Sequence, residues 1–327
     1  MAVKGMEEGP GGLPAGMWLY SFMFDEKWSL SEMVEEQRLP APSSLALGIA
    51  VGAVLTGARF ALDYLVFLPA GRKILGFSKR RDNRIAVPAL DRLCSTSKIL
   101  SSEEVARACA LTGMSAENVR GYAKERRILF QENKKLGKFK EAAWRLVVYL
   151  SLVVYALNLT LGKPWLADSE LTWEDWPLGH LADGLDSFYH VAMGVYWHFV
   201  VFQFWDTRRS DFWQMLVHHG ATLFLLTFSW LLSLLRIGTL IMLCHDVSDI
   251  FMETAKLFNY SQKRFHWCHL AADGFFFVFA GVFGVARLYV FPKYLILTVW
   301  RTTVLTDFTR SFFWVLLCTL LLLHMFW

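Results

Sequence analysis

Long apolar runs separated by charged segments dominate the hydrophobic pattern of this chain. Seven runs are long enough and poor enough in charge to cross a hydrocarbon layer of about 30 Å, for which a helix needs about 20 residues. These runs cover residues 44–70, 143–162, 185–205, 212–232, 237–258, 266–291 and 311–327. The pattern predicts an all-α integral membrane protein with about seven transmembrane helices.

Composition supports a membrane protein and argues against a soluble one. Hydrophobic residues make up 55% of the chain and charged residues only 19%, below the roughly 25% that is usual in soluble domains. The five cysteines form no CxxC pair, so neither a zinc finger nor a disulfide framework is indicated. Most of the chain is therefore expected to lie in the bilayer.

The charged segments between the runs differ in sign. Residues 71–142 hold 17 Lys and Arg against 8 Asp and Glu, a net charge of +9, whereas residues 163–184 have a net charge of −4. Because basic segments stay on the cytosolic side, we expect 71–142 in the cytosol and 163–184 in the lumen. Alternation then places the N-terminal segment 1–43 in the lumen and the C-terminus of the region 143–327 in the cytosol.

The basic segment 71–142 has a helix-turn-helix-like pattern. One helix start is predicted at Ser101–Glu104 and a second at Ser115–Glu117, with a break between them. The second helix, predicted from about Ala116 to Asn133, carries several Arg and Lys side chains, which suit either nucleic acid or an anionic lipid leaflet. We favour the lipid leaflet, because the segment is tethered to a membrane, and expect no nucleic-acid partner.

Ionisable residues inside the predicted spans are the strongest functional signal, because such groups are costly in lipid. The fourth span contains His218 and His219, and the fifth contains His245, Asp246 and Asp249. Only a few residues join these two spans, so they are expected to be antiparallel neighbours whose polar side chains meet near mid-membrane. The first span contains a further pair of charges one helical turn apart, which we expect to form an ion pair: Arg59 and Asp63.

A buried cluster of His and Asp has several interpretations. It can be a catalytic site, a structural hydrogen-bond network, a metal site or the proton relay of a transporter. A transporter is the least favoured of these, since no inverted repeat or pair of interrupted helices is evident.

The order of the polar residues over positions 218–256 is more specific than the cluster alone. The segment contains HH-x2-T, a Ser followed by an aromatic residue, R-x-G, HD-x2-D and E-x2-K. This pattern resembles the Lag motif of ceramide synthases. The resemblance covers about residues 140–327 as a TLC domain and, more weakly, residues 95–140, which are similar to the truncated homeobox-like segment of animal members. The remaining motif positions are Thr222, Ser229, Trp230, Arg236, Gly238, Glu253 and Lys256.

The resemblance implies an N-acyltransferase that joins a fatty acyl group from acyl-CoA to a long-chain sphingoid base. It further implies six spans in a TLC-type helical barrel or bundle around an intramembrane cavity, in the membrane of the endoplasmic reticulum. Neither a metal nor a cofactor is expected, and whether the protein forms a homo- or heterodimer is left open. The segment from Pro292 to Asp307 is a determinant of acyl length by family analogy. The competing interpretation is a TLC-domain lipid sensor or translocation-associated protein without activity.

Amide formation from an ammonium and a thioester needs a base and a group that stabilises an oxyanion. Imidazole suits the first task near neutral pH. We therefore expect His218 and His219 to act as the acid–base pair, with His245 beside them and Asp246 and Asp249 as orienting groups. An alternative makes one of these histidines a nucleophile that carries the acyl group as an acyl-imidazole.

Substrate-binding residues are expected on both sides of this cluster. Four basic residues at predicted cytosolic mouths are candidates for contacts with the CoA phosphates: Arg208, Arg209, Lys263 and Arg264. The resemblance adds Thr222, Ser229 and Trp230 as substrate-binding positions. Other histidines are interpreted as core or interfacial residues: His190, His198, His266, His269 and His324.

Overall fold

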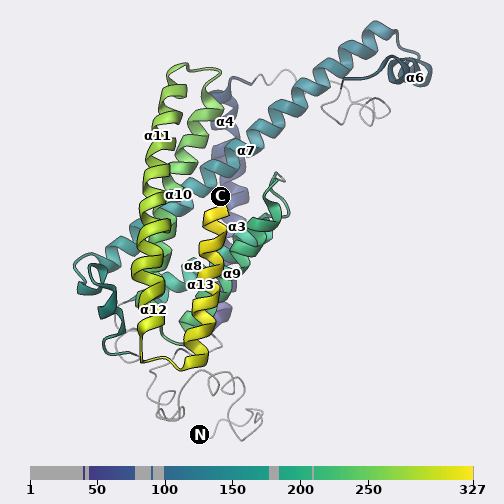
Figure 1. The fold of residues 1–327 in the computed structure, drawn as a ribbon. Coiled ribbons are helices and arrows are strands. Elements are labelled where there is room, and N and C mark those ends of the chain that lie inside the picture. The colour runs from purple at the N-terminus through teal and green to yellow at the C-terminus, as the bar shows by residue number, and fades with distance from the viewer. Residues whose placement is uncertain are drawn as a thin grey trace, which may run out of the picture. The chain divides into compact units, whose positions relative to one another are not determined.

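The computed structural model describes residues 40, 44–77, 90, 99–176, 184–207 and 210–326, and every regular element in these ranges is helical (Figure 1). The N-terminal elements are α3 (Leu45–Leu62), the π-helix η2 (Asp63–Phe67), α4 (Leu68–Leu75), α6 (Ser102–Thr112) and α7 (Ala116–Thr160). Two short 3-10 helices follow, η4 (Pro164–Leu166) and η5 (Ser169–Trp173). The remaining elements are α8 (Leu185–Phe202), α9 (Phe212–Leu231), α10 (Leu235–Ser261), α11 (Trp267–Phe283), the π-helix η7 (Gly284–Ile296), α12 (Leu297–Arg301) and α13 (Asp307–Phe326).

Each of the seven predicted spans coincides with a helix or a continuous set of helices. Within the part of the chain that the structure describes, four stretches are long and apolar enough to cross a membrane by length and composition: Leu45–Leu75, Ala116–Thr160, Trp267–Arg301 and Asp307–Phe326. The chain is thus a multi-pass helical membrane protein. Membrane crossing by α8, α9 and α10 stays a prediction, and α9 and α10 carry the His and Asp side chains that lower their mean hydropathy.

The second predicted span differs from the structure in where it begins. We expected separate helices over about 116–133 and 143–162, but α7 continues without interruption from Ala116 to Thr160. The intervening residues 134–142 contain no proline and are mostly Lys, Glu, Ala and Leu, which are strong helix formers. Hydropathy finds the apolar end of such a helix, but not the polar continuation that backbone hydrogen bonds maintain.

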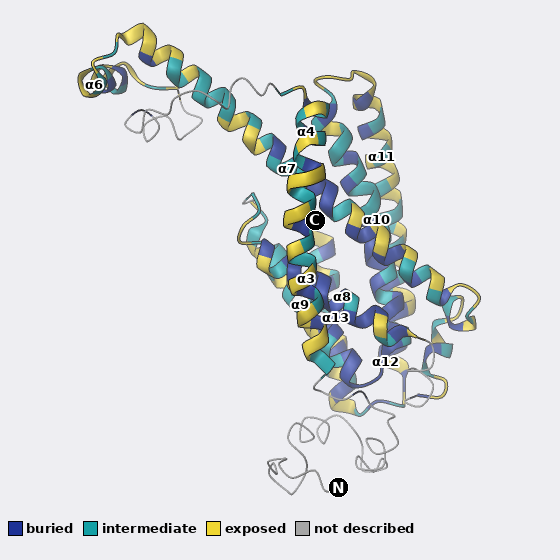
Figure 2. Cartoon of the chain, turned by 180° about the vertical axis from the view of Figure 1, so that it is seen from behind, coloured by how far each residue is buried: buried dark blue, intermediate teal, exposed yellow. Residues whose placement is uncertain are grey.

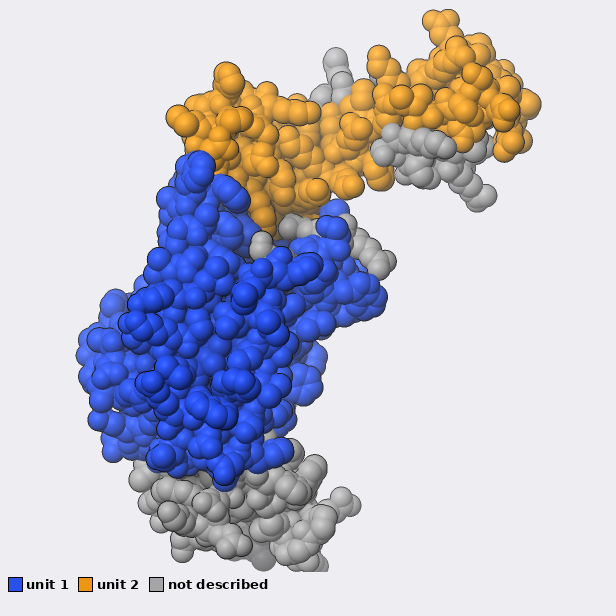
Figure 3. Space-filling view, in the orientation of Figure 1, with its two compact units in different colours: residues 1–60, 145–253, 274–327 blue, residues 61–144, 254–273 orange. Residues whose placement is uncertain are grey.

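The chain divides into two compact units (Figure 3). The first comprises residues 1–60, 145–253 and 274–327, and the second residues 61–144 and 254–273. The second unit has a small core where α6 meets the start of α7, built on Val105, Ala108 and Val119. Another of its cores joins α4 to the middle of α7 through Leu75, Leu136 and Phe139.

Both helix starts predicted in the basic segment are confirmed. The Ser101 hydroxyl accepts from the Glu104 amide, and the Glu104 carboxylate accepts from the Ser101 amide, which is a complete capping box. Gly113 ends α6 in the left-handed conformation with φ of 70°. The Ser115 hydroxyl then accepts from the Asn118 amide at the start of α7.

In the first unit α8 is the central helix. Most of its side chains are buried, whereas α3 buries only Gly48, Gly52 and Arg59 and presents apolar side chains outward, as a lipid-facing helix does (Figure 2). α8 packs against α9, and α13 packs against both α9 and η7. These neighbours bring residues 185–231 and 284–326 around the polar part of α10.

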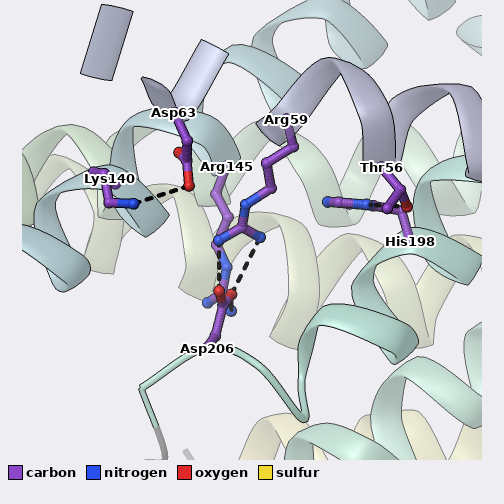
Figure 4. A network of polar contacts seen from close by, with 7 residues as sticks. All are labelled: Thr56, Arg59, Asp63, Lys140, Arg145, His198 and Asp206. Atoms are coloured by element: carbon purple, nitrogen blue, oxygen red, sulfur yellow. Dashed lines mark hydrogen bonds and ion pairs between the residues drawn. The ribbon is translucent and has the colours of Figure 1, made fainter. Parts of the chain in front are cut away.

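The charges of the first span have partners that local spacing does not reveal (Figure 4). In the first unit the Arg59 guanidinium donates to Asp206 in the α8–α9 connection, at 2.5 and 3.3 Å, and Arg145 lies 3.7 Å from the same carboxylate. In the second unit the Lys140 ammonium donates to Asp63 at 3.1 Å. The expected Arg59–Asp63 pair is therefore wrong, because each charge is paired by a residue distant in sequence.

Gly238 allows α8 and α10 to approach closely. A Cβ atom at this position would overlap the Tyr189 hydroxyl and lie 2.9 Å from the Tyr189 Cζ atom. That hydroxyl donates to the Leu234 carbonyl at 3.2 Å and accepts from the Ser229 hydroxyl at 3.2 Å. The glycine of the R-x-G pattern is thus required by packing, since a larger residue would break this buried hydrogen-bonded contact.

Replacing Gly238 by alanine is expected to lower the free energy of unfolding by about 1–3 kcal/mol, the usual cost of overpacking a filled core. Unfolding in mixed micelles would measure it. Tyr189→Phe removes the overlapping oxygen, so the double variant should lose less stability than the sum of the two single variants. Gly274→Ala in α11 is the matched control, because no atom lies within 4 Å of its added Cβ. Equal losses for both glycine variants would contradict this interpretation.

Candidate active site

The two adjacent histidines of α9 are buried and face different neighbours. His218 and His219 have exposed fractions of 8% and 3%, and their ring centres are 5.7 Å apart. The His219 ring lies against two aromatic residues of α8, Tyr196 and Phe199, with ring centres 6.0 and 5.6 Å away. The His218 ring points toward α13, where its centre is 5.9 Å from that of His324.

The polar residues of α10 are buried beside them. His245, Asp246 and Asp249 have exposed fractions of 6%, 2% and 9%. The Tyr196 hydroxyl lies 3.5 Å from an Asp246 carboxylate oxygen, which links α8 to α10. The His245 ring centre is 4.8 Å from that of His324. The structure thus brings the five histidines and aspartates named from the sequence into one buried cluster, while their catalytic roles stay predictions.

A buried arginine holds two members of the cluster in place. The Arg287 Nη2 atom donates to the His245 carbonyl at 2.7 Å and lies 2.7 Å from the Asp249 carboxylate. Arg287 belongs to the π-helix η7, which also contains Pro292. Proline has no backbone N–H for the helical ladder, and π-helical turns are frequent at functional sites.

Two imidazoles have their protonated nitrogen defined by a hydrogen-bond partner. The Ile241 carbonyl can only accept, so His245 donates from Nδ1 at 2.6 Å and its neutral ring has a lone pair on Nε2. Gln203 donates from Nε2 to the Phe212 carbonyl, so its Oε1 atom accepts from His219 Nδ1 at 3.1 Å. A backbone carbonyl and a side-chain amide therefore orient these two rings, and the orienting role expected of Asp246 and Asp249 stays a prediction.

Sequence reasoning missed four members of the cluster: Tyr196, Gln203, Arg287 and His324. Arg287 carried a usable signal, since an isolated Arg in an apolar span is costly and marks a functional position by default. Tyr196 and Gln203 carried none, because a single Tyr within an apolar helix and a single Gln at a helix end are both common. His324 was assigned to the core by frequency, and only its contacts show that it adjoins His218 and His245.

A narrow apolar cavity leads away from the cluster between α9, α10 and α13. Its volume is about 40 Å³, with Tyr196, Thr222 and His245 at one end and Trp173, Val299 and Leu305 among its other lining residues. Its α10 residues extend from Ile237 to His245, which is roughly 12 Å along a helix. The cavity therefore has an imidazole at one end and apolar walls beyond it.

The three expected substrate-binding residues of α9 have different surroundings. Thr222 and Ser229 line the cavity. Trp230 is buried and donates from Nε1 to the Asp186 carboxylate of α8 at 2.7 Å, and its ring packs against His190. Trp230 therefore packs between α8 and α9 and is not among the residues that line this cavity, and its expected role in substrate binding stays a prediction.

Of the four basic residues expected to bind CoA phosphates, the structure describes only two. Arg208 and Arg209 lie outside the described residues. Lys263 and Arg264 follow α10, and in the second unit Arg264 donates to the Lys73 carbonyl at 2.8 Å.

Among the residues that the structure describes, no group of three or more His, Cys, Asp or Glu side chains has the arrangement of a metal site.

This fold and cluster define a class: a multi-pass helical membrane protein with a buried His/Asp site beside an apolar cavity. The TLC domain profile matches residues 138–327. Human ceramide synthase 4 is 30% identical over 306 residues, covering 92% of this chain and 76% of that protein. Human ceramide synthase 5 is 36% identical over 199 residues, and Arabidopsis thaliana ceramide synthase LOH2 is 38% identical over 163 residues.

The chain belongs to the ceramide synthase family of TLC-domain proteins. The alignment with human ceramide synthase 5 covers 59% of this chain and 48% of that relative, and the alignment with LOH2 covers 50% and 53%. The chain therefore aligns with about half the length of these two relatives.

Proposed function

We propose that the protein transfers a fatty acyl group from acyl-CoA to the amine of a long-chain sphingoid base, giving a ceramide-type amide and CoA. The observation that supports this most directly is the cavity, since its apolar walls suit an acyl chain and its polar end is formed by His245 and Thr222. A fatty acyl chain that parts the walls of this small cavity as it enters would present its carbonyl carbon to the buried imidazoles.

In this proposal the histidines perform the proton transfers. A His218 or His219 imidazole takes a proton from the nitrogen as it attacks the carbonyl and returns one to the departing thiolate. In the alternative route His218 attacks first and carries the acyl group until the amine arrives. The Tyr196 hydroxyl and the guanidinium of Arg287 are the buried donors that define the electrostatics around the developing oxyanion.

The proposal places the protein in the endoplasmic reticulum membrane with the N-terminus in the lumen and the C-terminus in the cytosol. The net charge of +9 on residues 71–142 supports a cytosolic position for that segment. The acyl-CoA phosphates would then remain on the cytosolic side, where Arg208, Arg209, Lys263 and Arg264 are the candidate cations.

A direct assay tests the proposal. Purified full-length protein is supplied with labelled sphinganine and a panel of acyl-CoA chain lengths, and the amide product is measured. We expect product with the protein as it stands and none with the His218→Ala/His219→Ala variant. Absence of amide at every chain length would contradict the acyltransferase function and favour a lipid sensor of the same fold.

Leu305 offers a test of the cavity as the acyl site, because it lines the cavity between α12 and α13. Leu305→Trp should shorten the cavity and shift the preference toward shorter acyl-CoA. Each buried methylene contributes about 0.8 kcal/mol, so kcat/KM should fall about tenfold for every two methylenes that no longer enter.

The matched control for Leu305→Trp is Val282→Trp, which enlarges a residue in a separate apolar cavity between α10 and the α11–η7 helix. It should leave the chain-length profile unchanged. A shift caused by Val282→Trp, together with an unchanged profile for Leu305→Trp, would place the acyl chain in the other cavity.

A further inference from the structure

His324 is a buried histidine that the mechanism above does not use. It lies on α13 with an exposed fraction of 1%, and its ring is surrounded by four others. The ring centres of His245 and His218 are 4.8 and 5.9 Å away, and those of Phe291 and Phe283 are 5.8 and 6.0 Å away. α13 packs directly against α9 and η7, so this position belongs to the buried interior of the first unit.

Both ring nitrogens of His324 are buried, and neither has a hydrogen-bond partner within the described part of the chain. A buried polar group without a partner costs about 1–3 kcal/mol, so a purely structural histidine in an apolar site would be replaced by a hydrophobic residue at no loss. The observation points to a polar group that enters the site with the substrate and satisfies this ring.

The neighbouring imidazole narrows the chemistry of that group. His245 donates from Nδ1 to the Ile241 carbonyl, which leaves a lone pair on Nε2, and this atom also has no partner among the described residues. Lone pairs on two adjacent rings accept hydrogen bonds, so they suit an N–H-bearing group better than a carbonyl or carboxylate. Arg287 already supplies positive charge nearby, which favours an amine that gives up its extra proton on entry.

We propose that His324 is a further catalytic residue, which contacts the sphingoid amine and removes its first proton. The inference rests on the proposed acyl transfer. The R–NH3+ group transfers one proton to His324, giving R–NH2 and an imidazolium. The free amine attacks the acyl carbonyl, the new C–N bond forms as the bond to the acyl leaving group breaks, and the second proton leaves the nitrogen through His218 or His219 to the departing group. His324 finally releases its proton to solvent, which accounts for the one proton that the overall reaction produces.

The test measures the kinetic constants for the amine and for the acyl donor separately. With His324→Phe we expect the KM for acyl-CoA to stay within twofold and kcat/KM for sphinganine to fall by about 10²-fold or more. Because the variant depends on free amine from solution, its kcat/KM for sphinganine should rise about tenfold per pH unit below the amine pKa, more steeply than that of the unaltered protein. His324→Asn keeps a hydrogen-bonding group without a basic nitrogen, so it should show the same pH slope with a smaller loss.

The groups that face His324 and titrate or carry charge are His218 from α9, His245 from α10 and Arg287 from η7, and all three remain in both variants. His190→Phe is the matched control, because His190 is a buried histidine of α8 whose Nε2 atom likewise has no partner among the described residues. It should leave the pH slope unchanged.

An unchanged kcat/KM for sphinganine in His324→Phe, or equal losses for both substrates with an unchanged pH slope in both variants, would overturn the role of His324. Absence of amide from the unaltered protein at every acyl length would overturn the acyltransferase function, and the role of His324 with it.

Discussion

Replacing His218 by alanine is expected to lower the rate of amide formation by about 10²–10⁴-fold, the contribution of one acid–base group. His218 is 8% exposed and lies between His219 on its own helix and His324 on α13, so no bulk water can take over its proton transfer cheaply. If His218 also carries the acyl group, the loss should exceed this range, because the covalent route disappears entirely. The rate is measured as labelled ceramide formed from sphinganine and a saturating acyl-CoA.

A second measurement separates the two routes. Protein incubated with acyl-CoA and no amine should show a mass increase of one acyl group on the peptide that contains His218 if the acyl-imidazole forms. The absence of any adduct would favour direct transfer.

The control for His218→Ala is His198→Ala. His198 of α8 is also buried, but its Nδ1 atom lies 3.0 Å from the Thr56 hydroxyl of α3 (Figure 4). It should affect stability without a comparable loss of rate per folded molecule. Equal losses of rate for both variants would mean that burial, rather than chemistry, explains the effect of His218.

Replacing Arg287 by methionine is expected to lower the free energy of unfolding by about 3–5 kcal/mol, because Asp249 then lies buried without the guanidinium that neutralises it. The same change removes the donor to the His245 carbonyl, so the position of the His245 ring should become less defined and the activity of the remaining folded protein should fall. Unfolding in mixed micelles and the ceramide assay measure the two effects separately.

Two variants check this interpretation of Arg287. Asp249→Asn combined with Arg287→Met removes both charges, so it should recover part of the stability lost in the single Arg287 variant. Arg310→Met disrupts the ion pair with Asp307 at the start of α13, where the Asp307 side chain is exposed, and such pairs contribute only about 0–1 kcal/mol. A loss as large for Arg310→Met would indicate that the charge of any arginine, rather than the buried pair with Asp249, stabilises the fold.

Much of the fold could be predicted because the bilayer is a demanding solvent. A span of about 20 apolar residues must form a helix, since no water is present to satisfy its backbone. Hydropathy therefore located α3, α8, α9, α10, α11 and α13 to within several residues, but it missed the polar start of α7 and the helical continuation through η7 and α12 beyond residue 291. Capping chemistry located the starts of α6 and α7 in the same way, because Ser101 and Ser115 act on amides only three residues away.

The site could be predicted as far as residue type alone indicates the free-energy cost of placing a side chain in lipid. His218, His219, His245, Asp246 and Asp249 stand out because such groups are expensive in lipid, and α9 and α10 bring them together through a short connection. The ion-pair partners of the charged residues could not be predicted from residue type in this way. Local spacing favoured Asp63 as the partner of Arg59, whereas the structure pairs Arg59 with Asp206, which is 147 positions away.

The sequence by itself determined a helical membrane protein of the ceramide synthase type with a buried set of His and Asp residues. The length of an apolar run and the cost of an ionisable residue in lipid are local properties, so each can be read from a single stretch of the chain. Only the tertiary structure decided which groups complete that set. Arg287, Tyr196, Gln203 and His324 come from three other helical segments, and their approach depends on packing such as the contact of Gly238 with Tyr189. Contacts between distant segments depend on how the helices fill space together, and that information is not contained in any single stretch of the chain.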